Sequence, residues 1–183
     1  MKPRREIEIK LRVQNPRRLK RRLKELGFRR ATPRLLERNS LFDFPDARLT
    51  RARHAVRLRA SGGLNVLTFK GSPSLAGGYK SRVEIETAVG GAPELRRILE
   101  RIGMREVLCY NKYRTTYAPP GESGRGKIPV LVYDETPVGD FVELEGPRAW
   151  IDRVANQLGY SRDVYITKSY VALYLEGRAK PSK

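Results

Sequence analysis

The sequence predicts an α+β protein with one large antiparallel β-sheet, and three observations indicate this class. Polar and apolar residues alternate in eight short segments, which is typical of strands with one buried face. Three other stretches repeat apolar residues at helical spacing. The 183 residues fit one domain, and no linker divides them. A sheet of about eight strands is large enough to curl or to close on itself.

Each of three predicted helices carries a start signal and a stop signal. In the first, Asn15 is an N-cap candidate, Pro16 occupies the first helical position and Gly27 ends the helix. The other two are also opened by proline and closed by glycine. The helices are expected over residues 16–26, 93–102 and 147–158, and a fourth is expected to begin near residue 169.

The alternating segments lie between these helices. Residues 43–53 read as a polar loop, and residues 71–78 and 119–126 are Gly-, Pro- and Ser-rich loops expected to be mobile. Residues 1–176 are predicted to form a single domain, with residues 177–183 as a flexible tail. The strands are expected at residues 6–13, 40–44, 55–60, 64–70, 81–87, 110–118, 128–134 and 140–145.

Composition excludes several classes of protein. Lys and Arg number 38 against 20 acidic residues, so the net charge of +18 favours a polyanionic partner or serves only solubility. No apolar run approaches the roughly 18 residues of a membrane span, which makes the cytoplasm the expected compartment and a membrane partner unexpected. The single Cys109 and the single His54 exclude a disulfide framework, a cysteine-rich zinc site and a His-pair metal site.

The acidic residues show a more specific pattern. Within an alternating segment, two glutamates two positions apart point to the same face and lie about 7 Å apart. Their repulsion is about 2 kcal/mol at an effective dielectric near 20, so several such pairs need cations to hold them. A plain solvated sheet face would explain any one pair. The pairs are Glu6 with Glu8, Glu84 with Glu86, and Glu143 with Glu145.

Basic residues alternate in the same way, as Arg57 with Arg59 and Lys112 with Arg114. These pairs need an anion that the nearby acids cannot fully supply. A divalent metal ion with a polyphosphate satisfies both requirements, because carboxylate oxygens suit Mg²⁺ or Mn²⁺ and Arg or Lys side chains suit phosphate.

These residues resemble the signature of the CYTH superfamily, which groups class IV adenylate cyclases, thiamine triphosphatases and inorganic triphosphatases. Its characteristic Glu-x-Glu-x-Lys corresponds to Glu6, Glu8 and Lys10. Further elements follow in the family's order over nearly the whole chain: Arg57-x-Arg59, Leu67-Thr68-Phe69-Lys70-Gly71, Arg82-x-Glu84-x-Glu86, Lys112-x-Arg114, Asp134, Gly139-Asp140-Phe141-Val142-Glu143-Leu144-Glu145 and Lys168-Ser169-Tyr170.

The resemblance implies a closed antiparallel eight-stranded barrel, a triphosphate tunnel, with helices packed outside and charged side chains inside. It makes Glu8, Lys10 and Glu145 the expected catalytic residues, and Glu84 and Glu86 part of an acidic wall. The implied ligands of Mg²⁺ or Mn²⁺ are Glu6, Glu8, Asp134, Glu143 and Glu145. The implied triphosphate-binding residues are Lys10, Arg57, Arg59, Lys70, Arg82, Lys112, Arg114 and Lys168.

Three functions are compatible with these features. The favoured one is metal-dependent hydrolysis of an inorganic, thiamine or nucleoside triphosphate. The alternative is a class IV adenylate cyclase, which converts ATP to cyclic AMP and pyrophosphate with the same charged residues. A basic nucleic-acid-binding module is a more distant alternative, since aromatic residues interleave poorly with the basic first helix. Pairing of two copies through the outer helices is left open. The basic first helix, predicted over residues 16–26, carries Arg17, Arg18, Lys20, Arg21, Arg22 and Lys24.

Overall fold

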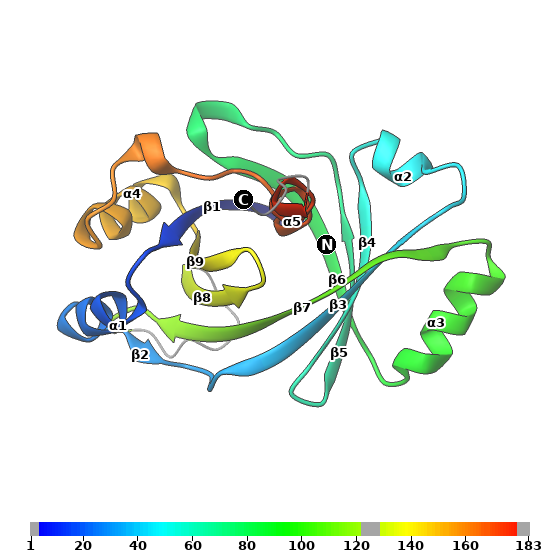
Figure 1. The fold of residues 1–183 in the computed structure, drawn as a ribbon, viewed down its shortest axis with the longest axis horizontal. Helices are drawn as coiled ribbons and strands as arrows, with labels where there is room; N and C mark the ends of the chain where they lie inside the picture. Colours follow the sequence, from blue (N-terminus) through cyan, green and yellow to red (C-terminus); the bar gives the residue numbers. More distant parts are fainter. Residues whose placement is uncertain (1–3, 122–128, 179–183) are drawn as a thin grey trace. The chain divides into compact units, whose positions relative to one another are not determined.

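The computed structural model describes residues 4–121 and 129–178. The strands of this part are β1 (Arg4–Val13), β2 (Arg29–Arg30), β3 (Leu35–Asp43), β4 (Ala55–Ser61), β5 (Leu64–Lys70), β6 (Lys80–Val89), β7 (Arg105–Ala118), β8 (Val130–Thr136) and β9 (Gly139–Glu145). Its α-helices are α1 (Pro16–Glu25), α2 (Arg48–Arg51), α3 (Ala92–Arg101), α4 (Arg148–Gln157) and α5 (Tyr170–Arg178), as Figure 1 shows.

The strands form one hydrogen-bonded sheet in the order β2-β7-β3-β4-β5-β6-β1-β9-β8. An additional antiparallel pairing joins β7 to β8, so that β1 and β3 to β9 make a closed ring of eight strands. Strands pair antiparallel in β1–β9, β3–β4, β4–β5, β5–β6 and β8–β9. The predicted class, α+β with a closed eight-stranded antiparallel barrel, is confirmed.

The chain divides into two compact units. Unit 1 comprises residues 1–6, 35–74 and 81–112, and it contains β3 to β5, nearly all of β6, and helices α2 and α3. Unit 2 comprises residues 7–34, 75–80 and 113–183, and it contains β8, β9 and helices α1, α4 and α5. Strands β1 and β7 each run from one unit into the other.

The apolar core of unit 1 joins α3, labelled in Figure 1, to strands β3 and β4. Phe42 and Leu58 come from the strands, and Leu99 and Met104 from α3 and the turn that follows it. Because side chains alternate along a strand, residues next to these in sequence point to the other face. Arg57 and Arg59 flank Leu58 in this way, so burial of the leucine fixes the direction of both arginines.

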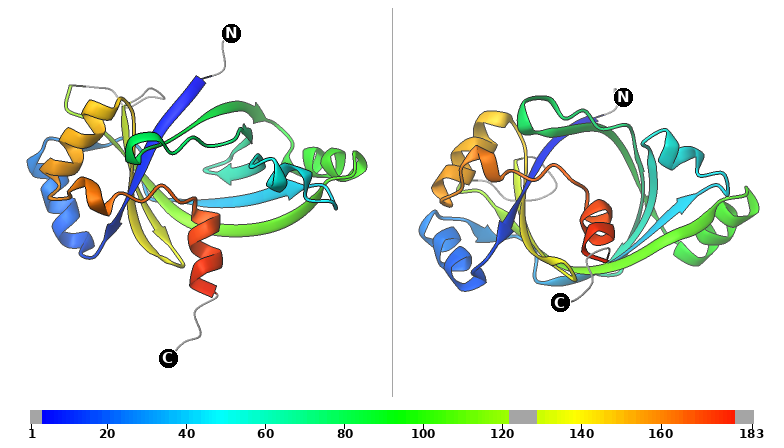
Figure 2. Two further views of the ribbon diagram at one scale, coloured as in Figure 1. Left: turned by 90° about the horizontal axis from the view of Figure 1, so that it is seen from above. Right: turned by 45° about the horizontal axis from the view of Figure 1, so that its top comes forward.

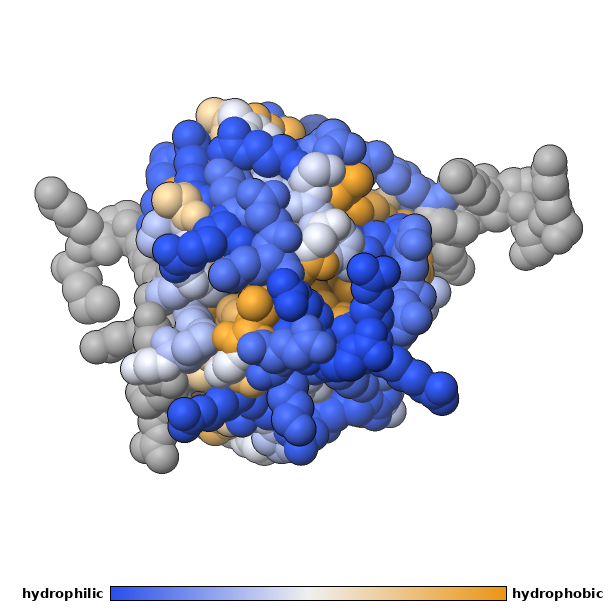
Figure 3. Space-filling view, turned by 90° about the vertical axis from the view of Figure 1, so that its left-hand side faces the viewer, coloured by the Kyte–Doolittle hydropathy of each residue, from blue (hydrophilic) through white to orange (hydrophobic). Residues whose placement is uncertain are grey.

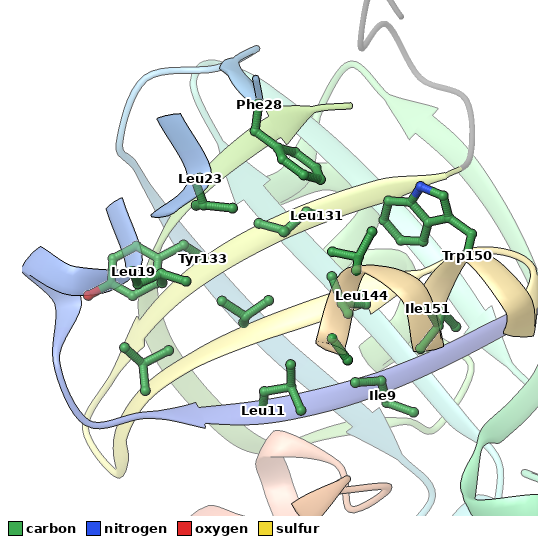
Figure 4. Packing of buried hydrophobic residues seen from close by; sticks show 14 of the residues in the cluster. Ile9, Leu11, Leu19, Leu23, Phe28, Leu131, Tyr133, Leu144, Trp150 and Ile151 are labelled. Carbon is green, nitrogen blue, oxygen red and sulfur yellow. The ribbon is translucent and has the colours of Figure 1, made fainter. Parts of the chain in front are cut away.

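Unit 2 has a larger core, in which β1, β9 and β8 pack against α1 and α4 (Figure 4). Ile9, Leu144 and Leu131 lie fully buried on one face of the three strands, and Ile151 of α4 is fully buried against them. Glu8 and Lys10 flank Ile9, and Glu143 and Glu145 flank Leu144, so these charged residues point to the opposite face. The apolar packing therefore positions the charged side chains.

The predicted helix boundaries are confirmed to within two residues. The Asn15 side chain accepts a hydrogen bond from the Arg18 backbone N–H at 2.9 Å, as an N-cap does. Gly27, Gly103 and Gly159 follow α1, α3 and α4 with φ of 77°, 92° and 87°. This left-handed conformation favours glycine and ends each helix.

Several elements differ from the expectation. Strand β3 begins at Leu35 and β7 at Arg105, five residues earlier than predicted in each case. Residues 43–53 are not only a loop, because α2 forms there around the Asp43 carboxylate, which accepts hydrogen bonds from three backbone N–H groups. Helix α5 extends to Arg178, and the rest of the predicted tail, residues 179–183, lies outside the described residues, as does most of the predicted 119–126 loop.

Candidate functional site

Strands β4, β5 and β6 of unit 1 carry a set of charged side chains on the face opposite the core. The register places Arg57 opposite Thr68, and Thr68 opposite Glu86, so the three form a row across the strands. Lys70 is likewise opposite Glu84. Lys112 of β7 and Glu37 of β3 join this set, and we call the whole the cationic cluster: Arg57, Arg59, Lys70, Arg82 and Lys112, with the carboxylates of Glu37, Glu84 and Glu86.

The Arg57 side chain is held in place by the other two residues of its row, Thr68 and Glu86. Its Nη2 donates to Thr68 Oγ1 at 3.2 Å and lies 3.4 Å from Glu86 Oε1, and Thr68 Oγ1 in turn donates to that oxygen at 2.7 Å. The Nε of Arg57 is buried and has no hydrogen-bond partner among residues 4–121 and 129–178. A buried donor without a partner costs about 1–3 kcal/mol, which an anionic ligand would offset.

Lys70 and Arg82 share the carboxylate of Glu84. The Lys70 ammonium donates to Glu84 Oε2, and Arg82 Nε donates to Oε1 at 2.7 Å. Burial, together with the positive charges of Arg57 and Arg82, lowers the pKa of Lys70 to about 7 in spite of Glu84. The pKa of Glu84 is lowered, because the charges of Lys70 and Arg82 outweigh the opposing effect of burial.

The contribution of β3 to this cluster was not predicted from the sequence. Glu37 Oε2 lies 3.4 Å from Lys112 Nζ, and Oε1 lies 3.9 Å from Arg59 Nη1. Asn39, opposite Arg59, is fully buried, and its Oδ1 has no hydrogen-bond partner in the described part of the chain. The signal was present, because Glu37 and Asn39 alternate as the other pairs do, but they precede the predicted strand.

Unit 2 carries a second charged set on β1, β9, β8 and the end of β7. The register places Glu8 opposite Glu145, Lys10 opposite Glu143, and Arg114 opposite Asp134. We call this set the acidic cluster: Glu8, Asp134, Glu143 and Glu145, with the cations Lys10, Lys80 and Arg114.

Asp134 is fully buried and is held by β7 and by α5. Arg114 Nε and Nη2 donate to its two oxygens at 2.7 and 2.6 Å, and the Tyr170 hydroxyl donates to Oδ2 at 2.7 Å. Tyr170 opens α5, which lies beside the β8–β9 hairpin in both views of Figure 2. Burial is the main cause that raises the pKa of Tyr170 well above its usual value, and the negative charges of Asp134 and Glu143 add to it. The hydroxyl therefore stays protonated and acts as a hydrogen-bond donor.

Two lysines share Glu8. The Oε1 of Glu8 accepts hydrogen bonds from Lys80 Nζ at 2.6 Å and from Lys10 Nζ at 3.2 Å. Lys10 also lies 3.5 Å from Glu143 Oε2. Lys80 was not among the predicted site residues, because it stands one residue before the predicted strand and follows a glycine-containing turn.

The predicted site residues thus fall into the two clusters, except for Glu6 and Lys168. Glu6 is half-buried and belongs to unit 1 rather than to the acidic cluster. Glu86 belongs to the cationic cluster, but its side chain is 40% exposed. Lys168 lies apart, since its ammonium is 2.8 Å from Glu176 Oε1 on α5 and 56% of its side chain is exposed.

The acidic cluster offers carboxylate oxygens, the type of ligand that suits a divalent cation. Glu8 and Glu145 are opposite each other, and two carboxylates about 5 Å apart repel by about 3 kcal/mol at an effective dielectric near 20. Carboxylate oxygens are the ligands that Mg²⁺ and Mn²⁺ prefer. Glu8, Glu143 and Glu145 are therefore the side chains that could hold such an ion. Within residues 4–121 and 129–178, no three acidic, His or Cys side chains lie close enough together to do so as they stand.

A hollow lies on the surface of unit 2, on the side where Figure 3 shows hydrophobic residues among hydrophilic ones. It has a volume of about 300 Å³ and is lined chiefly by Leu26, Phe28, Trp150 and Val154. Basic side chains of α1 are exposed nearby, as the alternative of a nucleic-acid-binding module requires. No helix in the described part of the chain is long and apolar enough to cross a bilayer.

The fold and these clusters define a class of protein: a closed antiparallel barrel whose strands carry buried charges of both signs. Residues 4–170 match the CYTH domain model, and the chain belongs to the CYTH family. A protein of Methanocaldococcus jannaschii named "putative adenylate cyclase" is 29% identical over 178 residues, covering 92% of this chain and 97% of that protein.

Solved structures share the fold. A protein of Vibrio parahaemolyticus, also named a "putative adenylate cyclase", superposes with a TM-score of 0.81 at 19% identity, covering 95% of this chain and 99% of that one. A Hippeastrum protein described as a "putative adenylyl cyclase" with a dominant triphosphatase activity superposes with a TM-score of 0.67 at 20% identity, covering 96% and 98%.

Proposed function

We propose that this protein is a divalent-metal-dependent phosphohydrolase that acts on a triphosphate. The observation that carries the proposal is the cationic cluster, in which five basic side chains stand against three carboxylates. Its surplus of positive charge lies among buried residues and not on a freely solvated surface. A ligand with several negative charges close together, such as a triphosphate, matches it.

Arg57 supports this role in atomic detail. Its guanidinium is braced by Thr68 and Glu86 while its buried Nε lacks a partner in the described chain. A phosphate oxygen is the kind of acceptor that this N–H requires. Arg59, Lys70, Arg82 and Lys112 would bind further phosphate oxygens, each being held in place by a carboxylate.

The acidic cluster would hold the metal ion, Mg²⁺ or Mn²⁺, through Glu8, Glu143 and Glu145. Such an ion neutralises phosphate charge and lowers the pKa of a bound water. The protein's own part is to position the phosphates and to exclude competing partners. Lys10 would contribute both to the metal site and to phosphate binding, because it lies between Glu8 and Glu143 and its ammonium suits a phosphate oxygen. Asp134 would act through Arg114 and Tyr170, which hold both of its oxygens.

Adenylate cyclase activity is the second candidate. The relative from Methanocaldococcus jannaschii carries that name, and the same charged clusters suit attack of a ribose hydroxyl on the α-phosphorus. The Hippeastrum protein has the same fold with a dominant triphosphatase activity, so the fold accommodates hydrolysis. Hydrolysis is favoured here because the charged clusters suit phosphate and metal groups, which every triphosphate offers.

The test is a product analysis with purified protein and Mg²⁺ or Mn²⁺. Tripolyphosphate, thiamine triphosphate and ATP are incubated separately, and the products are separated by chromatography. Release of orthophosphate supports the proposal, and cyclic AMP with pyrophosphate from ATP supports the cyclase. Turnover of none of the three substrates, with no metal-dependent tripolyphosphate binding, would refute both.

A salt titration separates these activities from nucleic-acid binding. Binding to a phosphate backbone by the exposed residues of α1 weakens steeply with salt, because counterions are released. Hydrolysis of a triphosphate depends instead on the divalent cation. Replacement of Arg18 and Arg21, which are exposed on α1, should leave triphosphate turnover unchanged.

A further inference from the structure

Lys80 is a buried cation that lies outside every sequence motif of the site. Only 4% of the residue is exposed, and its Nζ is 2.6 Å from Glu8 Oε1. The same oxygen accepts a hydrogen bond from Lys10 at 3.2 Å. One carboxylate oxygen thus serves two ammonium groups, and Lys80 makes the shorter of the two contacts.

The fold holds Lys80 in this position through the residue before it. Tyr79 is 2% exposed and packs in the apolar core of unit 2. Its hydroxyl donates to Asp152 Oδ1 at 2.5 Å and accepts from Arg162 Nη2 at 2.5 Å. Because neighbouring side chains of an extended segment point to opposite sides, the anchored Tyr79 directs Lys80 toward the charged face.

We propose that Lys80 is the resident counter-cation of Glu8 and competes with the divalent metal ion for this carboxylate. The inference rests on the proposed function, because it takes Glu8 as a metal ligand. A metal ion binds a carboxylate oxygen at about 2.1 Å. An ion bound at Oε1 would share that oxygen with the two ammonium groups, and an ion bound at the other oxygen would still lie within a few ångströms of the Lys80 charge. The two like charges would repel each other in surroundings with little water to screen them, so Lys80 and the ion compete for the carboxylate.

The competition predicts that removal of Lys80 strengthens metal binding, whereas removal of a ligand or of a residue that merely shapes the site weakens it. In Lys80→Met the side chain keeps most of its apolar length and loses its charge. Glu8 retains Lys10 as a partner, so the carboxylate is not left without a hydrogen bond. The sign of the change in affinity therefore identifies the role.

The experiment measures Mn²⁺ binding to the full-length protein without any triphosphate, by isothermal titration calorimetry and by the electron paramagnetic resonance signal of free Mn²⁺. We expect Lys80→Met to bind Mn²⁺ at least tenfold more tightly than the unsubstituted protein. Lys80→Arg, which keeps the charge, should bind it about as the unsubstituted protein does. Lys24→Met is the matched control, because it removes one exposed positive charge from α1 and should leave the affinity unchanged.

An unchanged or lower affinity in Lys80→Met overturns the inference, and so does a failure of both proteins to bind Mn²⁺. Should Lys80→Met not fold, the ¹⁵N signal of the Lys80 ammonium in the unsubstituted protein decides. Added Mg²⁺ should shift it strongly if Lys80 leaves Glu8, and an unshifted signal at saturating Mg²⁺ refutes displacement. Tighter Mn²⁺ binding in a protein that hydrolyses no triphosphate would refute the proposed function while leaving the competition intact.

Discussion

The cationic cluster of unit 1 and the acidic cluster of unit 2 use the same types of residue, yet their charge balance is opposite. Five basic side chains stand against three carboxylates in the first, and four carboxylates stand against three basic side chains in the second. The difference shows that the net charge of +18 does not locate the functional site. The local charge balance distinguishes the two clusters, and the proposed function assigns phosphate binding to the first and metal binding to the second.

The clusters are alike in burial, since each mixes buried charges with half-buried ones. In the cationic cluster Lys112 is buried and Arg59 is half-buried. In the acidic cluster Asp134 is buried and Glu145 is half-buried. Burial therefore does not rank the effects of substitutions, and the larger effect is expected where a metal ligand is lost.

The largest effect is expected from Glu145→Gln. This change keeps the size of the side chain and removes the carboxylate that lies opposite Glu8. We expect kcat to fall at least 100-fold, since a metal ligand is lost, while tripolyphosphate binding without metal is retained or strengthened. Steady-state kinetics over a range of Mg²⁺ concentrations and calorimetry without metal measure the two quantities. A fully active variant would remove Glu145 from the metal site and would contradict the distinction between the clusters.

Arg57→Met should have the opposite profile. A charge-assisted hydrogen bond contributes about 1.5–3 kcal/mol, so loss of the Arg57 contact should weaken triphosphate binding roughly 10- to 100-fold. Mn²⁺ binding without triphosphate should not change, because Arg57 belongs to unit 1 and its hydrogen-bond partners, Thr68 and Glu86, are not part of the acidic cluster. Calorimetric titrations with each ligand test both statements. Weaker Mn²⁺ binding with unchanged triphosphate binding would reverse the proposed roles.

Asp43→Asn tests whether unit 1 can be destabilised without changing its charged face. One carboxylate oxygen of Asp43 accepts from the N–H and the hydroxyl of Thr50, at 2.9 and 2.7 Å. An amide NH₂ there would face two donors, so we expect a loss of about 2 kcal/mol in the free energy of unfolding. Urea denaturation measures it. Triphosphate affinity at 25 °C should be unchanged, and a tenfold loss would show that the α2 region takes part in binding.

Local signals explain how much of the fold could be predicted. The Asn15 cap, the helix-ending glycines and the alternation of segments depend on neighbouring residues, and the structure confirms them. Helix α2 was missed because its formation depends on one carboxylate, Asp43, that binds backbone groups up to seven positions away. No periodicity marks such an arrangement.

The candidate site was predictable to a similar degree. Alternating charge pairs marked most of its residues, but not which partner each would have. Glu37 and Lys80 were missed because each lies just outside a predicted strand boundary. Tyr170 lies 36 positions from its partner Asp134, and Lys168 pairs with Glu176 of α5 rather than with a strand. Such pairings depend on strand register and helix placement, which the sequence pattern does not determine.

The smallest predicted effect concerns the protonation of Lys70. Its pKa of about 7 means that the free protein carries a largely neutral Lys70 at pH 8. A bound triphosphate favours the charged form, so binding at pH 8 should take up about half a proton or more at this residue. Calorimetry in two buffers with different ionisation enthalpies measures the uptake. Lys70→Arg is the control, because an arginine stays protonated and takes up no proton on binding. Subtracting the proton uptake of this variant from that of the unsubstituted protein cancels the protons taken up by the triphosphate itself.

The same shift has a consequence for stability, with a definite sign. An unfolded Lys70 has its ordinary pKa near 10.5, so between pH 7 and 10.5 the unfolded chain binds more protons at this residue than the folded one. The contribution of Lys70 to the free energy of unfolding therefore rises with pH across that window, and Lys70→Arg should lack this rise. Equal pH dependence in the two proteins would mean that Lys70 stays charged beside Glu84. The cationic cluster would then carry its full positive charge before any ligand binds.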